Sequence, residues 1–282
     1  MTFYRRPTDP NQGRSAWGGT TRRRGIGGGL IIAVFLAGFA LCKYYSNSQF
    51  NEITGEKQHI GISAEQEIAL GLESTPLMIE EFGGLHPDPE GQKIVKEIGQ
   101  RIVQNSDAKK TPYQYDFHLL ADPNTVNAFA LPGGQVFITT ALITQFESED
   151  QLAGVLGHEI AHVVARHGAE RIAKMELTQG LTGAAVIATG DYSTAQAAQL
   201  LANVVHMSYG RDQELESDDL GVRFMTQSGY NPEALISVME ILEKASGGQK
   251  QPEFMSTHPS PANRIQKIKD AIVKYKDLAP VQ

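Results

Sequence analysis

The sequence predicts a mostly helical α+β fold with a small β-sheet. Along most of the chain after residue 61, apolar residues recur at the period of a helix that packs on one face. The alternation typical of strands is confined to residues 113–120 and 128–140. The run His158-Glu159-Ile160-Ala161-His162 lies within an apolar helical segment, so two imidazoles are expected near the centre of the fold.

Capping signals indicate where two of the helices begin. The spacing Ser63-x-x-Gln66 is that of a capping box, and Ser148-x-x-Gln151 repeats it before a helix that ends near Arg166. The other elements are expected in this order: a helix over 94–103, a strand over 113–120, a turn at 122–124, a hairpin over 128–140, buried helices over 177–205, helices over 212–228 and 232–245, a loop over 246–253, and a last helix from Pro261.

Charge is unevenly distributed along the 282 residues. The formal net charge is −7, yet residues 1–24 alone carry +5, so the rest of the chain carries −12. An acidic body argues against nucleic acid as a partner. The single cysteine, Cys42, excludes both an internal disulfide framework and a zinc site made of cysteines.

An uncharged apolar segment follows the basic start. Gly25 to Cys42 are 18 residues rich in Leu, Ile, Val, Ala and Phe, which just reaches the length of a membrane span. Arginines precede the segment and only Lys43 follows it, so the positive-inside rule places the N-terminus in the cytoplasm and the rest outside. Two alternatives stay open, a cleaved signal peptide and a lipoprotein modified at Cys42.

The predicted organisation therefore has four parts. Residues 1–24 form a basic, disordered cytoplasmic tail, residues 25–42 a transmembrane anchor and residues 43–60 a polar linker. Residues 61–282 form one folded domain, and we expect no second domain after it.

The chemistry of the chain centres on the paired histidines. His158 and His162 are four residues apart, so on a helix both imidazoles lie on one face and can bind the same Zn²⁺. Glu159 lies beside them, where a carboxylate can take a proton from an activated water. This H-E-x-x-H pattern is typical of zinc metallopeptidases.

A catalytic zinc site usually has a third protein ligand. In the metzincins this ligand is a histidine six residues after the second histidine of the motif. Here that position is Gly168, and the nearest histidine is His167, so the register excludes a metzincin. We interpret His167 as structural, with a ring that hydrogen-bonds the backbone.

The acidic run from Arg211 to Asp219 offers the alternative third ligand. Glu214 and Asp218 begin a helical stripe that becomes apolar downstream and therefore faces the core. A second stripe is polar and expected to be solvated; it holds Glu216, Asp219, Arg223 and Gln227.

Two core-facing carboxylates need a positive partner, and a zinc ion supplies one. We therefore predict that Glu214 is a zinc ligand and that Asp218 holds a ligand histidine by its other N–H. The alternative is an acidic run on a solvated helix, paired with arginines.

Five motifs together resemble metallopeptidase family 48, from about residue 62 to residue 265. They are Ile62-Ser63-Ala64-Glu65-Gln66-Glu67, Asn127-Ala128-Phe129-Ala130-Leu131-Pro132-Gly133-Gly134, His158-Glu159-Ile160-Ala161-His162, Glu214-x-Glu216-Ser217-Asp218, and Thr257-His258-Pro259-Ser260. Within this family the chain resembles the periplasmic outer-membrane quality-control members and the mitochondrial stress-activated members. Two positions depart from the family's usual residues: Ser217 replaces an alanine and Gly210 a serine.

The resemblance implies a zincin-like metallopeptidase domain, of the gluzincin type, with one Zn²⁺ per chain held by His158, His162 and Glu214. Glu159 is then the general base. His258 matches a histidine that in relatives either stabilises the oxyanion or makes a fourth, inhibitory contact to zinc. Tyr209 is a second candidate for the oxyanion.

The resemblance also implies how substrate binds. Residues 127–140 match a strand segment beside the cleft, so Asn127, Ala128, Phe129 and Gly134 are expected to bind an extended substrate by backbone pairing.

The sequence thus predicts a membrane-anchored zinc endopeptidase whose catalytic domain lies in an extracytoplasmic space such as the bacterial periplasm. Its expected substrates are unfolded or misassembled extracytoplasmic and membrane proteins. The alternative is a latent protein, a chaperone or adaptor, whose zinc site is closed by His258. Neither the cleavage specificity nor the oligomeric state follows from the sequence.

Overall fold

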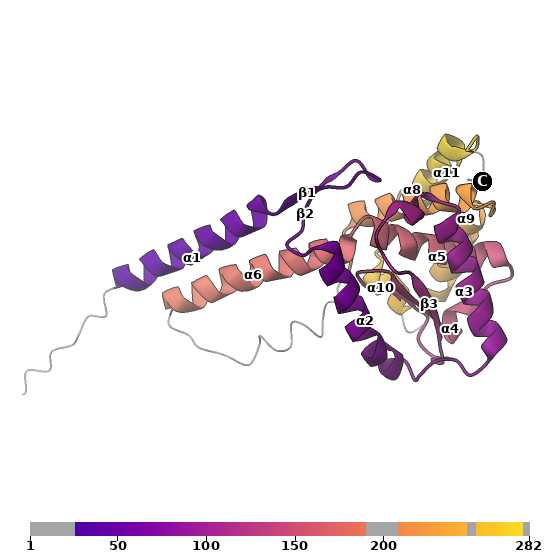
Figure 1. The fold of residues 1–282 in the computed structure, drawn as a ribbon, viewed down its shortest axis with the longest axis horizontal. Helices are drawn as coiled ribbons and strands as arrows, with labels where there is room; N and C mark the ends of the chain where they lie inside the picture. Colours follow the sequence, from indigo (N-terminus) through magenta and orange to yellow (C-terminus); the bar gives the residue numbers. More distant parts are fainter. Residues whose placement is uncertain (1–25, 190–207, 247–251, 279–282) are drawn as a thin grey trace, which may run out of the picture.

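Helix α5 (Glu149–Val164) runs through the centre of the folded domain, and almost all of its residues are buried. The computed structural model describes residues 26–189, 208–246 and 252–278 (Figure 1). Around α5 the chain forms, in order, α1 (Ile26–Ser46), β1 (Ser48–Phe50), β2 (Lys57–His59), α2 (Ala64–Glu81), α3 (Pro89–Gln104), the 3-10 turn η1 (Asp107–Lys110), β3 (Asp116–Leu120), β4 (Ala128–Ala130), β5 (Gln135–Thr139), α4 (Thr140–Ile143), α6 (His167–Thr189), α8 (Arg211–Gln227), α9 (Ala234–Ser246), α10 (Glu253–Thr257) and α11 (Arg264–Tyr275). The predicted mostly helical α+β fold with a small sheet is confirmed.

The larger sheet has three strands in the order β3-β5-β4. β3 and β5 are parallel, while β4 and β5 form the predicted antiparallel hairpin, with Phe129 opposite Phe137. Gly133 and Gly134 have φ angles of 86° and 110°, a backbone conformation that side chains with a Cβ rarely adopt. The turn that sequence analysis placed here therefore requires its two glycines.

Helices α3, α8 and α9 pack on α5, and α11 packs on α8. The approach of α8 to α5 is unusually close, because Gly157 on α5 faces Gly221 on α8. A Cβ on Gly221 would lie 3.3 Å from the backbone nitrogen of His158. The small residues let the two helices bring their polar side chains together at one place.

The two predicted capping boxes form differently. In α2, the Ser63 hydroxyl accepts from Gln66 N–H and the Gln66 side chain accepts from Ser63 N–H, as predicted. In α5, the Ser148 hydroxyl accepts from the N–H of Gln151, but the Gln151 side chain accepts from Glu147 N–H. The second box is therefore only half correct.

Helix α5 ends at Val164, two residues before the predicted end. Arg166 has a φ of 56°, and this left-handed residue separates α5 from α6. Its side chain forms a buried ion pair with Glu67 of α2. The sharp junction turns the chain out of the domain.

The predicted polar linker contains a β-hairpin that sequence analysis did not predict. β1 and β2 pair antiparallel, and the hairpin attaches to the end of α5. The Asn51 side chain donates to Val164 O at 2.8 Å, and the Gln58 side chain donates to Ala165 O. Ile60 beside the hairpin is buried.

The prediction of buried helices over residues 177–205 is wrong in the part that the structure describes. α6 leaves the domain and runs beside α1, forming a two-helix extension (Figure 1). Leu181 on α6 is 37% exposed. Residues 190–207, the predicted tail over 1–24 and most of the predicted loop over 246–253 lie outside the described residues.

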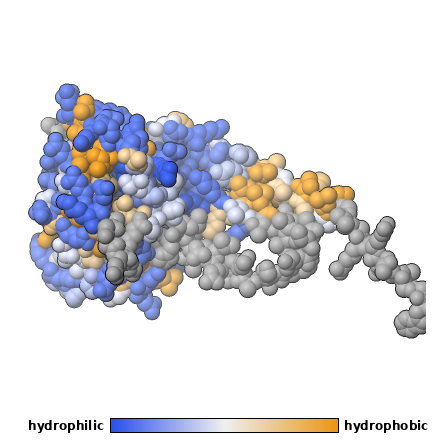
Figure 2. Space-filling view, turned by 180° about the vertical axis from the view of Figure 1, so that it is seen from behind, coloured by the Kyte–Doolittle hydropathy of each residue, from blue (hydrophilic) through white to orange (hydrophobic). Residues whose placement is uncertain are grey.

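One helix in the described part of the chain is long and apolar enough to cross a membrane, over Gly29–Ser46. Its apolar side chains are largely exposed, including Phe35 and Phe39 at 79% and 70%. Figure 2 shows hydrophobic residues gathered on this extension, whereas the domain surface is mainly hydrophilic.

Candidate metal centre

Four potential metal ligands converge from three parts of the fold. His158 and His162 lie on α5, Glu214 on the first turn of α8, and His258 directly after α10. One ligand atom from each lies within 4.8 Å of the others, and all four side chains are buried. The structure therefore brings together the three predicted ligands, and it places His258, the residue expected either at the oxyanion or as a fourth contact, within the same group.

The distances among these atoms fit a small cation. The Nε2 atoms of His158 and His162 are 3.1 Å apart, and Glu214 Oε1 is 3.4 Å from His162 Nε2. Two atoms bound to one tetrahedral zinc ion at 2.0–2.1 Å are separated by roughly 3.3 Å. Nitrogen and carboxylate ligands in this number are also the chemistry that zinc prefers. The residues present thus fit a zinc ion.

His258 closes this set of ligands. Its Nδ1 lies 3.1 Å from Glu214 Oε1 and 3.4 Å from His158 Nε2. Its Nε2 points toward Glu159 Oε1 at 3.6 Å. The histidine can therefore act as a fourth ligand through one nitrogen while the other faces the neighbouring carboxylate.

Asp218 lies where sequence analysis placed it, behind a ligand histidine. Its Oδ1 is 2.9 Å from His158 Nδ1. Burial lowers the pKa of His158, but the hydrogen bonds and charges of Asp218 and Glu214 outweigh burial and raise the pKa to about 9. The carboxylates thus stabilise positive charge at this point, whether a proton or a metal ion supplies it.

Arg264 is a central residue that sequence analysis missed. It is almost fully buried, and its guanidinium donates from Nε to Asp218 Oδ2 at 2.7 Å and from Nη2 to Oδ1 at 3.0 Å. Nη2 also lies 3.2 Å from Glu214 Oε2. Burial raises the pKa of Asp218, but Arg264 and His158 outweigh it and hold the pKa below its usual range.

A sequence signal for Arg264 did exist. It stands four residues before Ile268, on the same stripe of an otherwise amphipathic helix that buries Ile268 and Ala271. A charged residue on an apolar stripe predicts a buried partner. The two core-facing carboxylates therefore have an arginine partner as well as the predicted cation.

Glu159 is buried, and neither of its carboxylate oxygens has a hydrogen-bond partner among the described residues. Burial raises the pKa of Glu159, and the charges of His258 and His158 oppose this effect. A carboxylate with a raised pKa, placed beside a cation site, is suited to accept a proton.

His167 is buried, as expected of a structural residue, but it does not bond the backbone. Its Nδ1 lies 2.9 Å from His162 Nδ1, and its Nε2 lies 3.0 Å from Glu216 Oε2. The ring therefore connects a metal-ligand histidine to a carboxylate on α8. Ser217, where the family usually has alanine, places its hydroxyl 3.3 Å from the same ring.

The two stripes predicted on α8 differ in outcome. The core-facing stripe is confirmed, since Glu214, Asp218, Val222 and Met225 are all buried. The second stripe is only partly solvated, because Glu216, Asp219 and Arg223 are half-buried against neighbouring elements and Gln227 is buried. Its partners are His167 for Glu216, Lys274 and Tyr275 for Asp219, and Asp107 for Arg223 and Gln227.

Tyr209 covers the metal ligands. Its ring stacks on that of His162 with a centroid separation of 3.8 Å, and the Arg171 guanidinium lies 3.7 Å from the centre of its other face. Tyr209 N–H donates to Thr257 O at 2.8 Å, which ties this cover to the residue before His258. The adjoining cavity, lined by Tyr209, Ala130 and His162 among others, has a volume of about 10 Å³. A space of this size holds at most one water, and His162 is the only one of the four candidate ligands among its lining residues.

β4 forms an edge of the sheet beside this cavity. Asn127 O accepts from Thr139 N–H and Leu131 N–H donates to Gln135 O, so the backbone groups of Ala128 and Ala130 point to the opposite edge. Both alanines are buried, so this edge is covered in the present conformation.

Two of the predicted substrate contacts need correction. The Phe129 ring stacks on Phe137 at a centroid separation of 4.8 Å and belongs to a small apolar core, and its backbone faces β5, so Phe129 does not lie on the outer edge of β4. Gly134 lies against the backbone of Gln114 and Tyr115, on the β3 side of the sheet. It shapes the turn and does not lie on the outer edge.

A helical domain whose central helix presents two histidines and a glutamate to a third ligand from a later helix is a zincin-type metallopeptidase fold. The chain belongs to peptidase family M48, whose model matches residues 89–272. It is 30% identical over 248 residues to the mitochondrial metalloendopeptidase OMA1 of Schizosaccharomyces pombe, an overlap of 85% of this chain and 71% of that protein.

Two further relatives match over smaller shares of their length. The beta-barrel assembly-enhancing protease of Escherichia coli is 29% identical over 221 residues, which is 73% of this chain and 45% of that protein. Mitochondrial metalloendopeptidase OMA1 of Arabidopsis thaliana is 34% identical over 163 residues, which is 57% of this chain and 32% of that protein. The predicted family and the two predicted branches are thus confirmed.

Proposed function

We propose that this protein is a membrane-anchored zinc endopeptidase with one Zn²⁺ per chain, held by His158, His162 and Glu214. The observation that carries the proposal is the buried carboxylate of Glu159, which has no hydrogen-bond partner among the described residues and lies beside three converging candidate ligands. When bound, zinc supplies Lewis-acid chemistry that activates water and polarises a peptide carbonyl.

In the proposed reaction one side chain transfers the proton, two hold a ligand in position and one stabilises the oxyanion. Glu159 accepts a proton from the attacking water and passes it to the leaving amine. Asp218 orients His158 through its Nδ1, and Arg264 holds Asp218 in place. His258, whose Nε2 has no hydrogen-bond partner in the described structure, can donate to the oxyanion of the tetrahedral intermediate.

An extended substrate would pair with the outer edge of β4, at the backbone of Ala128 and Ala130, once this edge, which is covered in the present conformation, is exposed. Asn127, whose buried Oδ1 lacks a hydrogen-bond partner among the described residues, lies at the end of this edge and can accept from a substrate N–H. Pairing through the backbone accepts many sequences, which suits unfolded chains.

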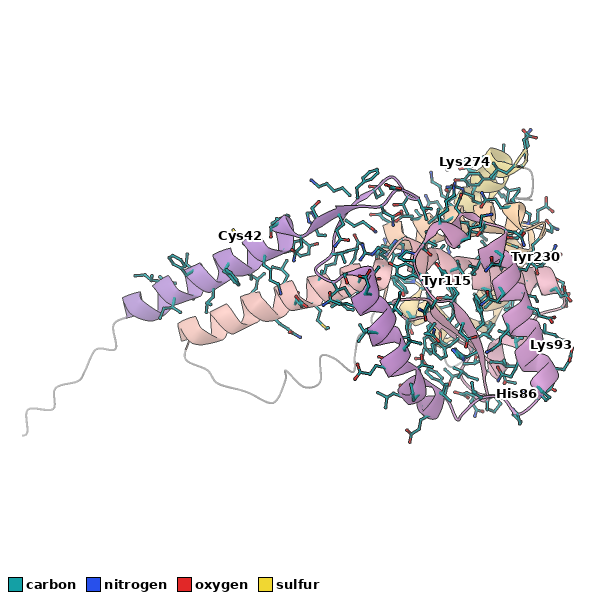
Figure 3. All side chains as sticks on the ribbon, in the orientation of Figure 1. Cys42, His86, Lys93, Tyr115, Tyr230 and Lys274 are labelled. Carbon is teal, nitrogen blue, oxygen red and sulfur yellow. The ribbon has the colours of Figure 1, made fainter. Side chains whose placement is uncertain are left out.

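The proposed location is a membrane surface. α1 crosses the membrane with the basic N-terminus in the cytoplasm, and the metal centre faces an extracytoplasmic space such as the periplasm. The folded hairpin at residues 48–59 and the ion pair between Lys43 and Glu176, at 2.8 Å, support an α1 that stays attached after synthesis. Cys42 lies within α1 and is exposed (Figure 3), so a lipoprotein cleaved before it would lose most of this helix.

The expected substrates are unfolded or misassembled extracytoplasmic and membrane proteins. The names of the relatives support this class, since one is a beta-barrel assembly-enhancing protease and another a mitochondrial metalloendopeptidase.

The test combines metal analysis with cleavage of casein, an unfolded substrate. Glu159→Gln is expected to retain one zinc per chain and to lose at least 100-fold in cleavage rate, because it cannot accept the proton. Glu149→Gln, an exposed residue on the same helix, is the matched control and is expected to cleave like the wild type. Cleavage by Glu159→Gln at the wild-type rate would refute the mechanism.

A second candidate function is favoured by the closed geometry. His258 completes a set of four ligands, as in structural zinc sites, and the adjoining cavity admits only one water. In this alternative the protein is a latent protease or a chaperone. His258→Ala then raises casein cleavage, whereas an oxyanion role predicts a loss of roughly 100-fold.

A further inference from the structure

Helix α6 continues well beyond the domain that it leaves. From His167, which contacts the metal ligands, it runs along α1 in the antiparallel sense and reaches Thr189 (Figure 1). The two helices approach closely near Gly180, where an added Cβ would lie only 2.9 Å from the Cβ of Ala40. Small residues at such a crossing are typical of helices that pack inside a membrane.

The distal half of α6 is unusual in composition. Leu177 to Gly190 are 14 residues without a charged side chain. Half of these residues are Ala, Leu, Val or Ile, and an uncharged run of this length and composition is typical of a buried core helix or of a segment that enters a membrane without crossing it. The core is excluded here, because this half lies outside the domain and Leu181 is 37% exposed.

Glu176, the last charged residue of α6, lies beside Lys43, where the apolar part of α1 ends. Glu176 pairs with Lys43 at 2.8 Å, and beyond this pair neither helix carries a charge in the described residues. Tyr44 and Tyr45 lie at this level and contact the His59 ring, with centroid separations of 5.0 and 5.3 Å. Tyrosines and a lysine at the end of an apolar helix are typical of the membrane–water interface.

We propose that the distal half of α6, from Leu177 to Thr189, inserts into the lipid bilayer beside α1. These 13 residues span about 20 Å of helix, less than the roughly 30 Å hydrocarbon core, so the segment enters the bilayer without crossing it. The chain is back at the metal centre by Tyr209. The proposed surroundings are lipid hydrocarbon, because the exposed Leu181 lies on the same two-helix extension as the exposed apolar side chains of α1. The inference rests on the proposed anchoring by α1.

The consequence is that the metal centre is held at a fixed height above the membrane. α5 passes into α6 through two residues, and the hairpin between α1 and α2 is bonded to the end of α5. The peptidase domain is therefore attached to the bilayer by two helices, and substrates must reach it at the membrane surface.

Fluorescence quenching by lipid tests the insertion. The full-length protein, with its single tryptophan removed by Trp17→Phe, is reconstituted into phosphatidylcholine and phosphatidylglycerol vesicles whose acyl chains carry bromine. Leu181→Trp is compared with Phe35→Trp on α1 and with Val273→Trp on α11. Val273 is 66% exposed and adjoins Lys274, which lies on the domain away from the extension (Figure 3).

We expect brominated lipid to quench the Leu181→Trp variant at least half as strongly as Phe35→Trp, and to leave Val273→Trp unquenched. Leu181→Trp emission that behaves like that of Val273→Trp, with Phe35→Trp quenched, would overturn the inference and leave the anchor intact. Unquenched Phe35→Trp would overturn both. Casein cleavage measured on the same vesicles reports on the proposed peptidase activity separately.

Cross-linking tests the pairing with α1. In a Cys42→Ser background, Ala40→Cys and Gly180→Cys are combined, since their Cβ atoms lie close enough for a disulfide after a small adjustment. A cross-link on mild oxidation in vesicles is expected. Leu41→Cys, whose position on α1 is 39% exposed, replaces Ala40→Cys in the control and is expected to give little product. Equal yields from the two pairs would show that α6 does not pack on α1 as proposed.

Discussion

Arg264 is expected to be the strongest single determinant of the stability of the metal centre. Its guanidinium is buried and makes two hydrogen bonds to Asp218, at 2.7 and 3.0 Å, and one ion pair to Glu214 at 3.2 Å. Arg264→Met keeps a side chain of similar length and removes the charge. Two carboxylates in the interior then lose their fixed positive partner.

The magnitude follows from burial. Removing one member of a buried ion pair costs about 3–5 kcal/mol, because the remaining charge stays desolvated. His158, whose pKa is already raised by the same carboxylates, offsets part of this cost, so we expect a loss of about 3 kcal/mol. A loss of this size is about a fifth to three fifths of the free energy of unfolding of an ordinary domain.

The assay is urea unfolding of the detergent-solubilised chain, with metal removed by a chelator so that the protein ligands alone are compared. Arg101→Met is the matched control, because Arg101 is exposed and lies 4.5 Å from the centre of the Tyr230 ring; it is expected to cost under about 1 kcal/mol. Asp218→Asn, made alone and together with Arg264→Met, completes a double-mutant cycle, and the expected interaction energy between the two residues is about 2 kcal/mol. A cost below about 1 kcal/mol for Arg264→Met, or additive effects in the cycle, would refute the reasoning.

Three other outcomes are expected. His167→Ala removes the ring that contacts His162 and is expected to weaken zinc binding by about 10- to 100-fold. The affinity is measured by competition with a chromogenic chelator. His86→Ala is the control and is expected to leave the affinity unchanged. The pKa of Asp107 lies below its usual range, because hydrogen bonds and nearby cations outweigh the effect of burial. The ionised Asp107 carboxylate therefore adds to the free energy of unfolding above about pH 4, and this contribution is lost as the pH falls further. Asp107→Asn should thus be less stable than wild type at neutral pH, with the difference narrowing in acid. Tyr209→Ala is expected to speed zinc removal by a chelator several-fold, because the Tyr209 ring covers His162. Tyr209→Phe keeps the ring and is expected to leave the rate of zinc removal unchanged. Equal rates for the two variants would contradict this role.

The parts of the site that sequence analysis found are those set by local periodicity. His158 and His162 share a helical face whatever surrounds them, and the stripe that carries Glu214 and Asp218 is apolar further along. The pattern therefore indicated both which residues face inward and which chemistry requires them there.

The parts that sequence analysis missed depend on packing between distant segments. The partner of His167 on α8 is 49 residues away, and Arg264 lies 46 residues from Asp218. The hairpin over 48–59 consists of two strands of three residues each, too short for alternation to be recognised. The composition of the distal half of α6 fits either a core helix or a membrane segment. Only the direction of the helix, which leads out of the domain, distinguishes these two interpretations.

The arrangement of these missed contacts explains how the extension and the metal centre are connected. The C-terminal end of α5 offers the carbonyl oxygens of Val164 and Ala165, and the hairpin that follows α1 binds both. Directly after this end, α6 begins at His167, whose ring touches His162. A displacement of the two-helix extension relative to the domain would therefore act first on the turn at Arg166, and then on His162, a candidate metal ligand, through its contact with His167. Because Tyr209 covers that same ligand and bonds the residue before His258, a shift at this turn can loosen the cover and the fourth ligand together.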